Sequence, residues 1–298
     1  MGNPSQKVIP GHGLVFGVTL KIIASILIPV CFCVSAAAQT DDQLKYFADR
    51  IEFGTDDVKR DALQALQRFN TESASRVAAR GLKDPSPVIR ATAIGAVVSL
   101  PISDASALLV PFLRSSLPFI RKEAAHALAK VRDPDTAADL IGLLQRDRKG
   151  DVRAAAAFAL GTLGNVEAVQ PLTALLSKKP KSSHAFLRRS AARSIGQIAE
   201  LISNREITVN TPENFLPDDY KSSGRLKAAG NEFAAAAAVL ERVLANTKES
   251  NDTRRDAAFA LGAIGGAGSV PVLRRFAVNE DYFLAEICRE ALLKIAAR

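Results

Sequence analysis

The sequence predicts an all-α fold, a right-handed superhelical solenoid of about seven helical hairpins. Three observations support this prediction: a short pattern recurs along most of the chain, its copies are about 31 residues apart, and the apolar positions within each copy follow helical periodicity. The composition agrees, because 48% of the 298 residues are hydrophobic while only 6% are aromatic. A core with so few aromatic side chains must be aliphatic and rich in alanine.

Each copy of the pattern starts at a basic anchor residue. Small residues follow three and six positions later, an aliphatic residue follows at the seventh, and in several copies glycine follows at the eighth. The clearest copy, between Asp151 and Gly161, reads DVRAAAAFALG. The six basic anchors are Lys59, Arg90, Arg121, Arg153, Arg188 and Arg254, and a weaker seventh copy has Ala285 at this position.

A second amphipathic segment precedes each anchor segment, for example at residues 105–113, 136–144 and 168–176. Proline and glycine stand between the segments rather than within them, as expected of connections between helices. The repeating unit is therefore predicted to be a helical hairpin. No strand pattern competes with this prediction.

These copies resemble the HEAT-repeat family, in the short form also called the phycobilisome-lyase HEAT-like repeat. The resemblance covers roughly residues 42–202 and 229–298. It implies HEAT-like hairpins that stack because one hairpin cannot bury its apolar face alone. It also implies that the anchors are structural and bridge to neighbouring repeats. The motif concerns the fold and leaves the function open.

Residues 1–38 differ from the rest and are predicted to form a signal peptide. Lys7 and Lys21 are their only charged side chains, and residues 22–34 form a short, nearly all apolar run. The small residues 35–38 follow this run and resemble a signal-peptidase cleavage site. We therefore expect cleavage after Ala38 and an exported protein, periplasmic or secreted. The alternative is a protein anchored by an uncleaved N-terminal segment.

One pair of successive anchors is 66 residues apart, which predicts an insertion between repeats. We place repeats 1–5 at residues 41–202, an inserted loop at 203–230, and repeats 6–7 at 231–298. Phe215 and Tyr220 stand out in this loop because aromatic residues are scarce elsewhere. One interpretation is a binding loop, since long loops are often functional; the other is a loop that Phe215 and Leu216 pin to the scaffold.

The positive charge concentrates in two turns within successive hairpins. Residues 146–189 contain nine basic and three acidic groups, an excess of six. This equals the excess of residues 39–298, which have 37 basic and 31 acidic groups. Because equivalent turns of a solenoid align, we predict one basic edge, with ordinary solvated turns as the alternative. Its residues are Arg146, Arg148, Lys149, Lys178, Lys179 and Lys181.

No familiar catalytic, cofactor-binding or metal-binding pattern occurs in the sequence. Beyond residue 38 there are two histidines, His126 and His184, each followed by alanine, and a single cysteine, Cys288. The His-Glu pairs that hold iron in deoxyhypusine hydroxylase, a HEAT-repeat enzyme, are therefore missing. A phosphate-binding loop and a nucleophile elbow are missing as well. We predict no catalytic residue, no metal and no cofactor.

The sequence thus predicts an exported, non-catalytic scaffold for protein–protein interaction that uses the solenoid groove, the basic edge and the inserted loop. Its expected partner is an envelope protein or complex, with anionic lipid or polysaccharide as a further partner of the basic edge. Nucleic acid is excluded, because the chain has no tryptophan and export removes it from DNA. The alternative is a lyase-type HEAT-repeat enzyme or enzyme subunit, which two non-adjacent carboxylates in the groove would support.

Overall fold

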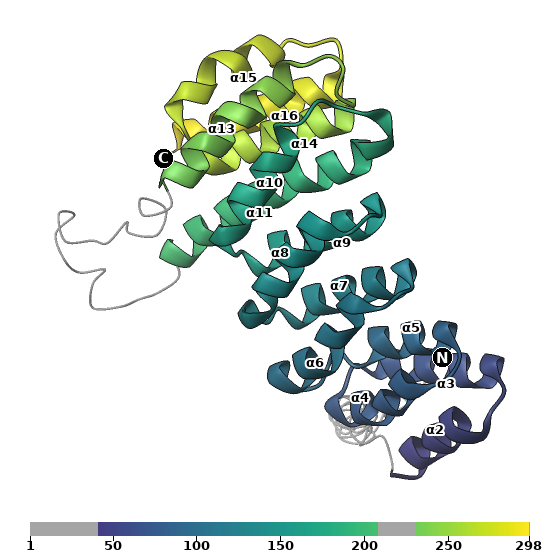
Figure 1. Cartoon of the computed structure of the whole chain (residues 1–298). Helices are drawn as coiled ribbons and strands as arrows, with labels where there is room; N and C mark the ends of the chain where they lie inside the picture. Colours follow the sequence, from purple (N-terminus) through teal and green to yellow (C-terminus); the bar gives the residue numbers. More distant parts are fainter. Residues whose placement is uncertain (1–40, 208–229, 298) are drawn as a thin grey trace, which may run out of the picture. The chain divides into compact units, whose positions relative to one another are not determined.

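The computed structural model describes residues 41–207 and 230–297, which Figure 1 shows as a series of paired helices. These residues form 14 α-helices and no β-strand. The chain divides into two units, residues 1–46 and 47–298, and only residues 41–46 of the first are described. None of the described helices combines the length and apolar character that a membrane span requires. The predicted signal peptide lies outside the described residues.

The helices pair into seven hairpins, which confirms the prediction of an all-α solenoid. Short 3-10 segments extend or precede several of the first helices. The pairs are α2 (Asp41–Phe53) with α3 (Asp56–Phe69), α4 (Glu72–Ala78) with α5 (Pro87–Ala96), α6 (Ile102–Leu109) with α7 (Pro118–Val131), α8 (Ala137–Arg146) with α9 (Gly150–Leu163), α10 (Val169–Leu176) with α11 (Ala185–Ile207), α13 (Gly230–Ala245) with α14 (Asn251–Ile264), and α15 (Val270–Phe276) with α16 (Tyr282–Ala296).

The second helices of successive hairpins pack directly against one another, from α5 through α7, α9, α11 and α14 to α16. The aliphatic residue seven positions after each anchor lies in this core, and Leu128, Leu160 and Leu261 are fully buried there. Small residues three and six positions after the basic anchors are buried beside it, except Ala65, which is partly exposed. The core is therefore aliphatic and alanine-rich, because small side chains allow the helix axes to approach closely.

Glycine eight positions after the anchor creates the closest approaches between second helices. A Cβ atom at Gly262 of α14 would lie 2.7 Å from both Cα and Cβ of Ala291 in α16. A Cβ atom at Gly196 of α11 would lie 2.9 Å from Cα of Ala260 in α14. Neither backbone can yield without separating two helices.

We expect Gly262→Ala to lower the free energy of unfolding by about 1–3 kcal/mol, because the added methyl group overpacks the contact between α14 and α16. Gly142→Ala is the matched control, since Gly142 lies within α8 and a Cβ atom there meets nothing within 4 Å. This control should gain about 0.5–1 kcal/mol, as alanine is favoured over glycine in helices. Urea unfolding measures both, and equal stability of the two variants would contradict the close approach.

Five of the six basic anchors donate to backbone carbonyls of their own hairpins, and three of the six pair with an acidic residue of the next hairpin. Arg121 donates to the Ser115 carbonyl over 2.8 Å and pairs with Asp147 of the following turn, with 2.6 Å between Nε and Oδ2. Lys59 pairs with Asp84 in the same way at 2.7 Å, and Arg188 pairs with Glu249. The other three anchors donate to carbonyls in the turn or near the end of the first helix of their own hairpins; they are Arg90, Arg153 and Arg254.

The insertion between repeats begins later than the sequence suggests. Helix α11 continues to Ile207, so residues 203–207 are helical rather than part of a loop, and α13 begins at Gly230. Phe215 and Tyr220 lie outside the described residues. Despite the insertion, α11 packs directly against α14, and α10 packs against α13.

Candidate functional site

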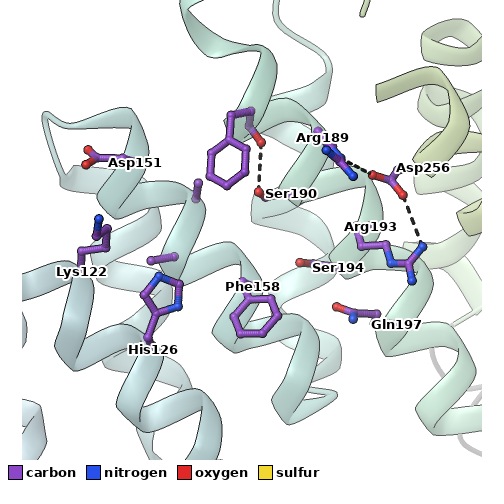
Figure 2. A pocket seen from close by; sticks show the side chains of 13 residues that line it. Lys122, His126, Asp151, Phe158, Arg189, Ser190, Arg193, Ser194, Gln197 and Asp256 are labelled. Atoms are coloured by element: carbon purple, nitrogen blue, oxygen red, sulfur yellow. Dashed lines mark hydrogen bonds and ion pairs between the residues drawn. The ribbon is translucent and has the colours of Figure 1, made fainter. Parts of the chain in front are cut away.

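A cavity of about 700 Å³ lies on the second helices of four successive hairpins, α7, α9, α11 and α14. Figure 2 shows its side chains, which combine aromatic groups with charges of both signs. The aromatic residues are His126, Phe158 and Phe186, and the charged residues are Lys122, Asp151, Arg189, Arg193 and Asp256. We call this space the groove cavity.

The repeat explains why these side chains share one face. Positions three, six and seven after each anchor point into the core, whereas positions one, five and nine lie along another face of the same helix. On α11 these positions are Arg189, Arg193 and Gln197, and all three line the groove cavity. The position five residues after the anchor forms a row across the four helices, the groove row: His126, Phe158, Arg193 and Phe259.

The groove row consists of two pairs of side chains in contact. The rings of His126 and Phe158 have centroids 5.9 Å apart. Arg193 places its guanidinium carbon 4.2 Å from the centroid of Phe259. Phe158 nevertheless remains 44% exposed, so part of this aromatic surface is open to a ligand.

A network of ion pairs borders the cavity on α11 and α14. Asp256 accepts from Nε of Arg189 at 3.1 Å and from Nη1 of Arg193 at 3.4 Å, as Figure 2 shows. Arg189 also pairs with Asp252 at 3.3 Å. Burial raises the pKa of Asp256 above its usual value and outweighs the opposing effect of the two arginines.

His126 shows a pKa shift of the opposite sign. Burial lowers its pKa below the usual 6.5, and the nearby Lys122 and Lys130 add to this effect while Glu123 opposes it. The imidazole is therefore neutral at pH 7 and can accept a proton. A histidine with a lowered pKa and an aspartate with a raised pKa in one cavity are typical of sites that transfer protons.

The described residues contain no group of three or more His, Cys, Asp or Glu side chains arranged to hold a metal ion. Cys288 lies buried in α16, and burial raises the pKa of its thiol to about 11. It is therefore protonated at neutral pH and inaccessible. The groove cavity offers acid–base groups and stacking surfaces rather than a metal centre or a nucleophilic thiol.

The six residues of the predicted basic edge lie elsewhere. They are exposed, at the end of α8 and in the turns that precede α9 and α11, and none of them lines the groove cavity. Arg146 borders a second cavity of about 410 Å³, together with Arg114 and Asp139. The predicted basic edge and the groove cavity are thus separate features of the surface.

Sequence reasoning missed every residue of the groove cavity as a site, although a signal was present. The repeat alignment drew attention to the recurring positions, which are structural. The lining of the cavity comes from variable positions, and the scarce aromatic residues Phe158 and Phe186 lie at such positions. An alignment of the copies read at these variable positions would have found them.

Comparisons with known proteins agree with the repeat pattern. The family described as HEAT repeats matches residues 78–160 and 143–208, and the family described as PBS lyase HEAT-like repeat matches residues 253–279. The chain is 29% identical over 160 residues to the bilin biosynthesis protein PecE of Mastigocladus laminosus. That match covers 52% of this chain and 55% of PecE, so the chain spans about half the length of this curated relative.

The fold also occurs in a solved structure. A crystal structure of an engineered protein has a TM-score of 0.53 at 21% identity, covering 85% of this chain and 68% of that one. The complex of CpcE and CpcF of phycocyanin lyase from Nostoc sp. PCC7120 has a TM-score of 0.46 at 20% identity, covering 87% and 89%.

Three expectations from the sequence are wrong in the light of the PecE match and the lyase-type repeat. They are the non-catalytic scaffold function, the absence of enzymatic activity, and the envelope protein, lipid or polysaccharide as partner. The error has a physical reason: a repeat protein assembles its site from single side chains on several hairpins. The residues of such a site do not form a contiguous motif in the sequence.

Proposed function

The chain belongs to the HEAT-repeat family, in its short phycobilisome-lyase-like form, and on that premise we propose that it is a lyase-type enzyme or enzyme subunit acting on a bilin. The observation that carries this proposal is the groove cavity, where exposed aromatic rings lie beside Arg189 and Arg193. Similarity to a bilin biosynthesis protein supports the choice of ligand class.

The chemistry of a bilin matches this lining. A bilin is a linear tetrapyrrole, conjugated and flat over much of its length, with two carboxylate arms. Aromatic faces such as Phe158 stack on conjugated rings, and arginine recognises carboxylates through paired N–H groups. The cavity volume of about 700 Å³ lies within the range of about 300–1,000 Å³ usual for small-molecule sites.

The proposed reaction is addition of a thiol across a carbon–carbon double bond of the bilin, or the reverse elimination. Sulfur bonds to one carbon, and the thiol proton goes to the neighbouring carbon. Neutral His126 is the group that accepts and returns this proton. Asp151 and Asp256 provide the two non-adjacent carboxylates in the groove that a lyase-type enzyme was expected to have.

The thiol comes from another molecule under this proposal. Cys288 is the sole cysteine among the described residues, and it is buried. A cysteine of a protein acceptor is the natural donor, because a surface groove remains open to a second protein. The partner is then a protein substrate rather than a component of the cell envelope.

Titration of the full chain with biliverdin tests ligand binding. We expect a saturable change in visible absorption, and we expect Phe158→Ala to weaken binding by about three- to tenfold through loss of stacking. Phe119→Ala is the matched control, since Phe119 is similarly exposed on α7 but does not line the cavity. Absence of any spectral change, or equal losses in both variants, would contradict the proposed site.

We further propose that residues 1–38 direct export and are removed after Ala38. N-terminal sequencing of the protein from fractionated cells tests this, with a chain that begins at Gln39 outside the cytoplasm as the expected result. A full-length chain in the membrane fraction would instead support the uncleaved anchor, and one in the cytoplasm would contradict export.

A further inference from the structure

Arg193 differs from the other charged residues of the groove cavity in how it is held. Its guanidinium carbon lies 4.2 Å from the centroid of the Phe259 ring, a cation–π contact that helps to hold the group in place. Its side chain is 51% exposed. The bond to Asp256, at 3.4 Å, is longer than the usual 2.7–3.2 Å. Arg193 is thus firmly placed but weakly paired.

Arg189 uses more of its N–H groups in ion pairs than Arg193 does. Its Nε donates to Asp256 at 3.1 Å, and its Nη1 pairs with Asp252 at 3.3 Å. Because Asp256 keeps this shorter bond to Arg189, it can release Arg193 and still have a partner. The carboxylate of Asp256 is mostly buried, at 11% exposure, and does not need to move for this exchange.

We infer that Arg193 receives a carboxylate arm of the ligand, and that Asp256 is an internal counter-ion that competes with that arm. The inference rests on the proposed function and adds the residue that recognises the charged part of the substrate. Arg193 is then a binding residue, and Asp256 sets its affinity.

The groove row also defines the shape of the ligand. Phe158 lies on α9 and Arg193 on α11, and neighbouring packed helices are about 8–10 Å apart. A ligand that contacts both side chains therefore combines a ring that stacks on Phe158 with a carboxylate arm that extends to the neighbouring helix. A linear tetrapyrrole meets this requirement, whereas a small dicarboxylic acid does not.

The experiment compares biliverdin with its dimethyl ester, which has the same conjugated system but no carboxylates. We expect the wild-type chain to bind the ester about tenfold more weakly, the usual scale for a charged hydrogen bond. Arg193→Gln should lower the affinity for biliverdin about tenfold and leave the affinity for the ester unchanged, so the two ligands then bind equally well. Arg193→Lys, which keeps the charge, should recover part of the difference.

Asp256→Asn is expected to act in the opposite direction. Removing the competing charge should increase the affinity for biliverdin by about two- to fivefold and leave the affinity for the ester unchanged. A variant that merely damaged the fold would weaken both ligands. Arg76→Gln is the control, because Arg76 is an exposed helical arginine paired with Glu72 and lies outside the cavity.

Each result decides the inference. Equal binding of acid and ester by the wild-type chain overturns the role of Arg193 but leaves the bilin proposal intact. Equal weakening of both ligands by Arg193→Gln also overturns it. Failure of the wild-type chain to bind either ligand overturns the proposed function together with the inference. Weaker binding of biliverdin by Asp256→Asn shows that Asp256 supports Arg193 rather than competes with the ligand.

Discussion

Glu249→Ala is expected to lower the free energy of unfolding by about 3–5 kcal/mol, because it leaves the buried guanidinium of Arg188 without its counter-ion. Arg188 lies within α11 and Glu249 lies in the turn before α14, and both are buried. The Nε atom of Arg188 is 3.1 Å and 3.0 Å from the two carboxylate oxygens. The same guanidinium donates to the carbonyls of Leu175, Leu176 and Lys178.

This pair matters because it joins the hairpins on either side of the insertion. The remaining bonds of Arg188 fix the turn after α10, so loss of Glu249 affects both hairpins. Urea unfolding measures the effect, with Glu72→Ala as the control, since Glu72 forms an exposed pair with Arg76 worth at most about 1 kcal/mol. Replacing both partners, as Arg188→Met with Glu249→Leu, should recover much of the loss. A loss below about 1 kcal/mol in Glu249→Ala would contradict this role.

His126→Gln is expected to lower the rate of thiol addition by about 100-fold or more, the usual contribution of a positioned general base. Glutamine keeps much of the volume of the side chain, so we expect the affinity for the bilin to change little. His184→Gln is the matched control, because His184 is exposed and does not line the cavity. Equal rates in both variants would remove His126 from the mechanism.

The pH dependence of the rate follows from the same residue. Burial lowers the pKa of His126 below 6.5, so the imidazole is neutral at pH 7 and becomes protonated only at lower pH. A protonated imidazole cannot accept the thiol proton. The rate should therefore fall as the pH drops through this lowered pKa, and the fall should be absent from the residual activity of His126→Gln.

The fold was predictable from the sequence because the repeat positions carry packing information. Leu128 and Leu160 recur at the same offset from their anchors, and both are buried. The pairing of Arg121 with Asp147 was predictable only in kind, since the resemblance implied a bridge to a neighbouring repeat without naming the acid. The end of α11 at Ile207 was not predictable, because residues 203–207 lack a helical period.

The site was less accessible to sequence reasoning, for a reason that follows from the architecture. Phe158, Arg193 and Asp256 lie on three different helices and are far apart in the chain, so only the stacking of hairpins brings them to one cavity. The opposite pKa shifts of His126 and Asp256 arise from burial, which no sequence pattern records. The search for contiguous motifs therefore failed to identify the site.

The rate of bilin–thiol adduct formation tests the central claim most directly. Phycocyanobilin and a small thiol are incubated with and without the full chain, and the visible spectrum is followed, because addition to a double bond shortens the conjugated system and shifts absorption to shorter wavelengths. A lyase-type groove predicts faster adduct formation with the wild-type chain than without it, and loss of this acceleration in His126→Gln. Equal rates with and without the chain would contradict it.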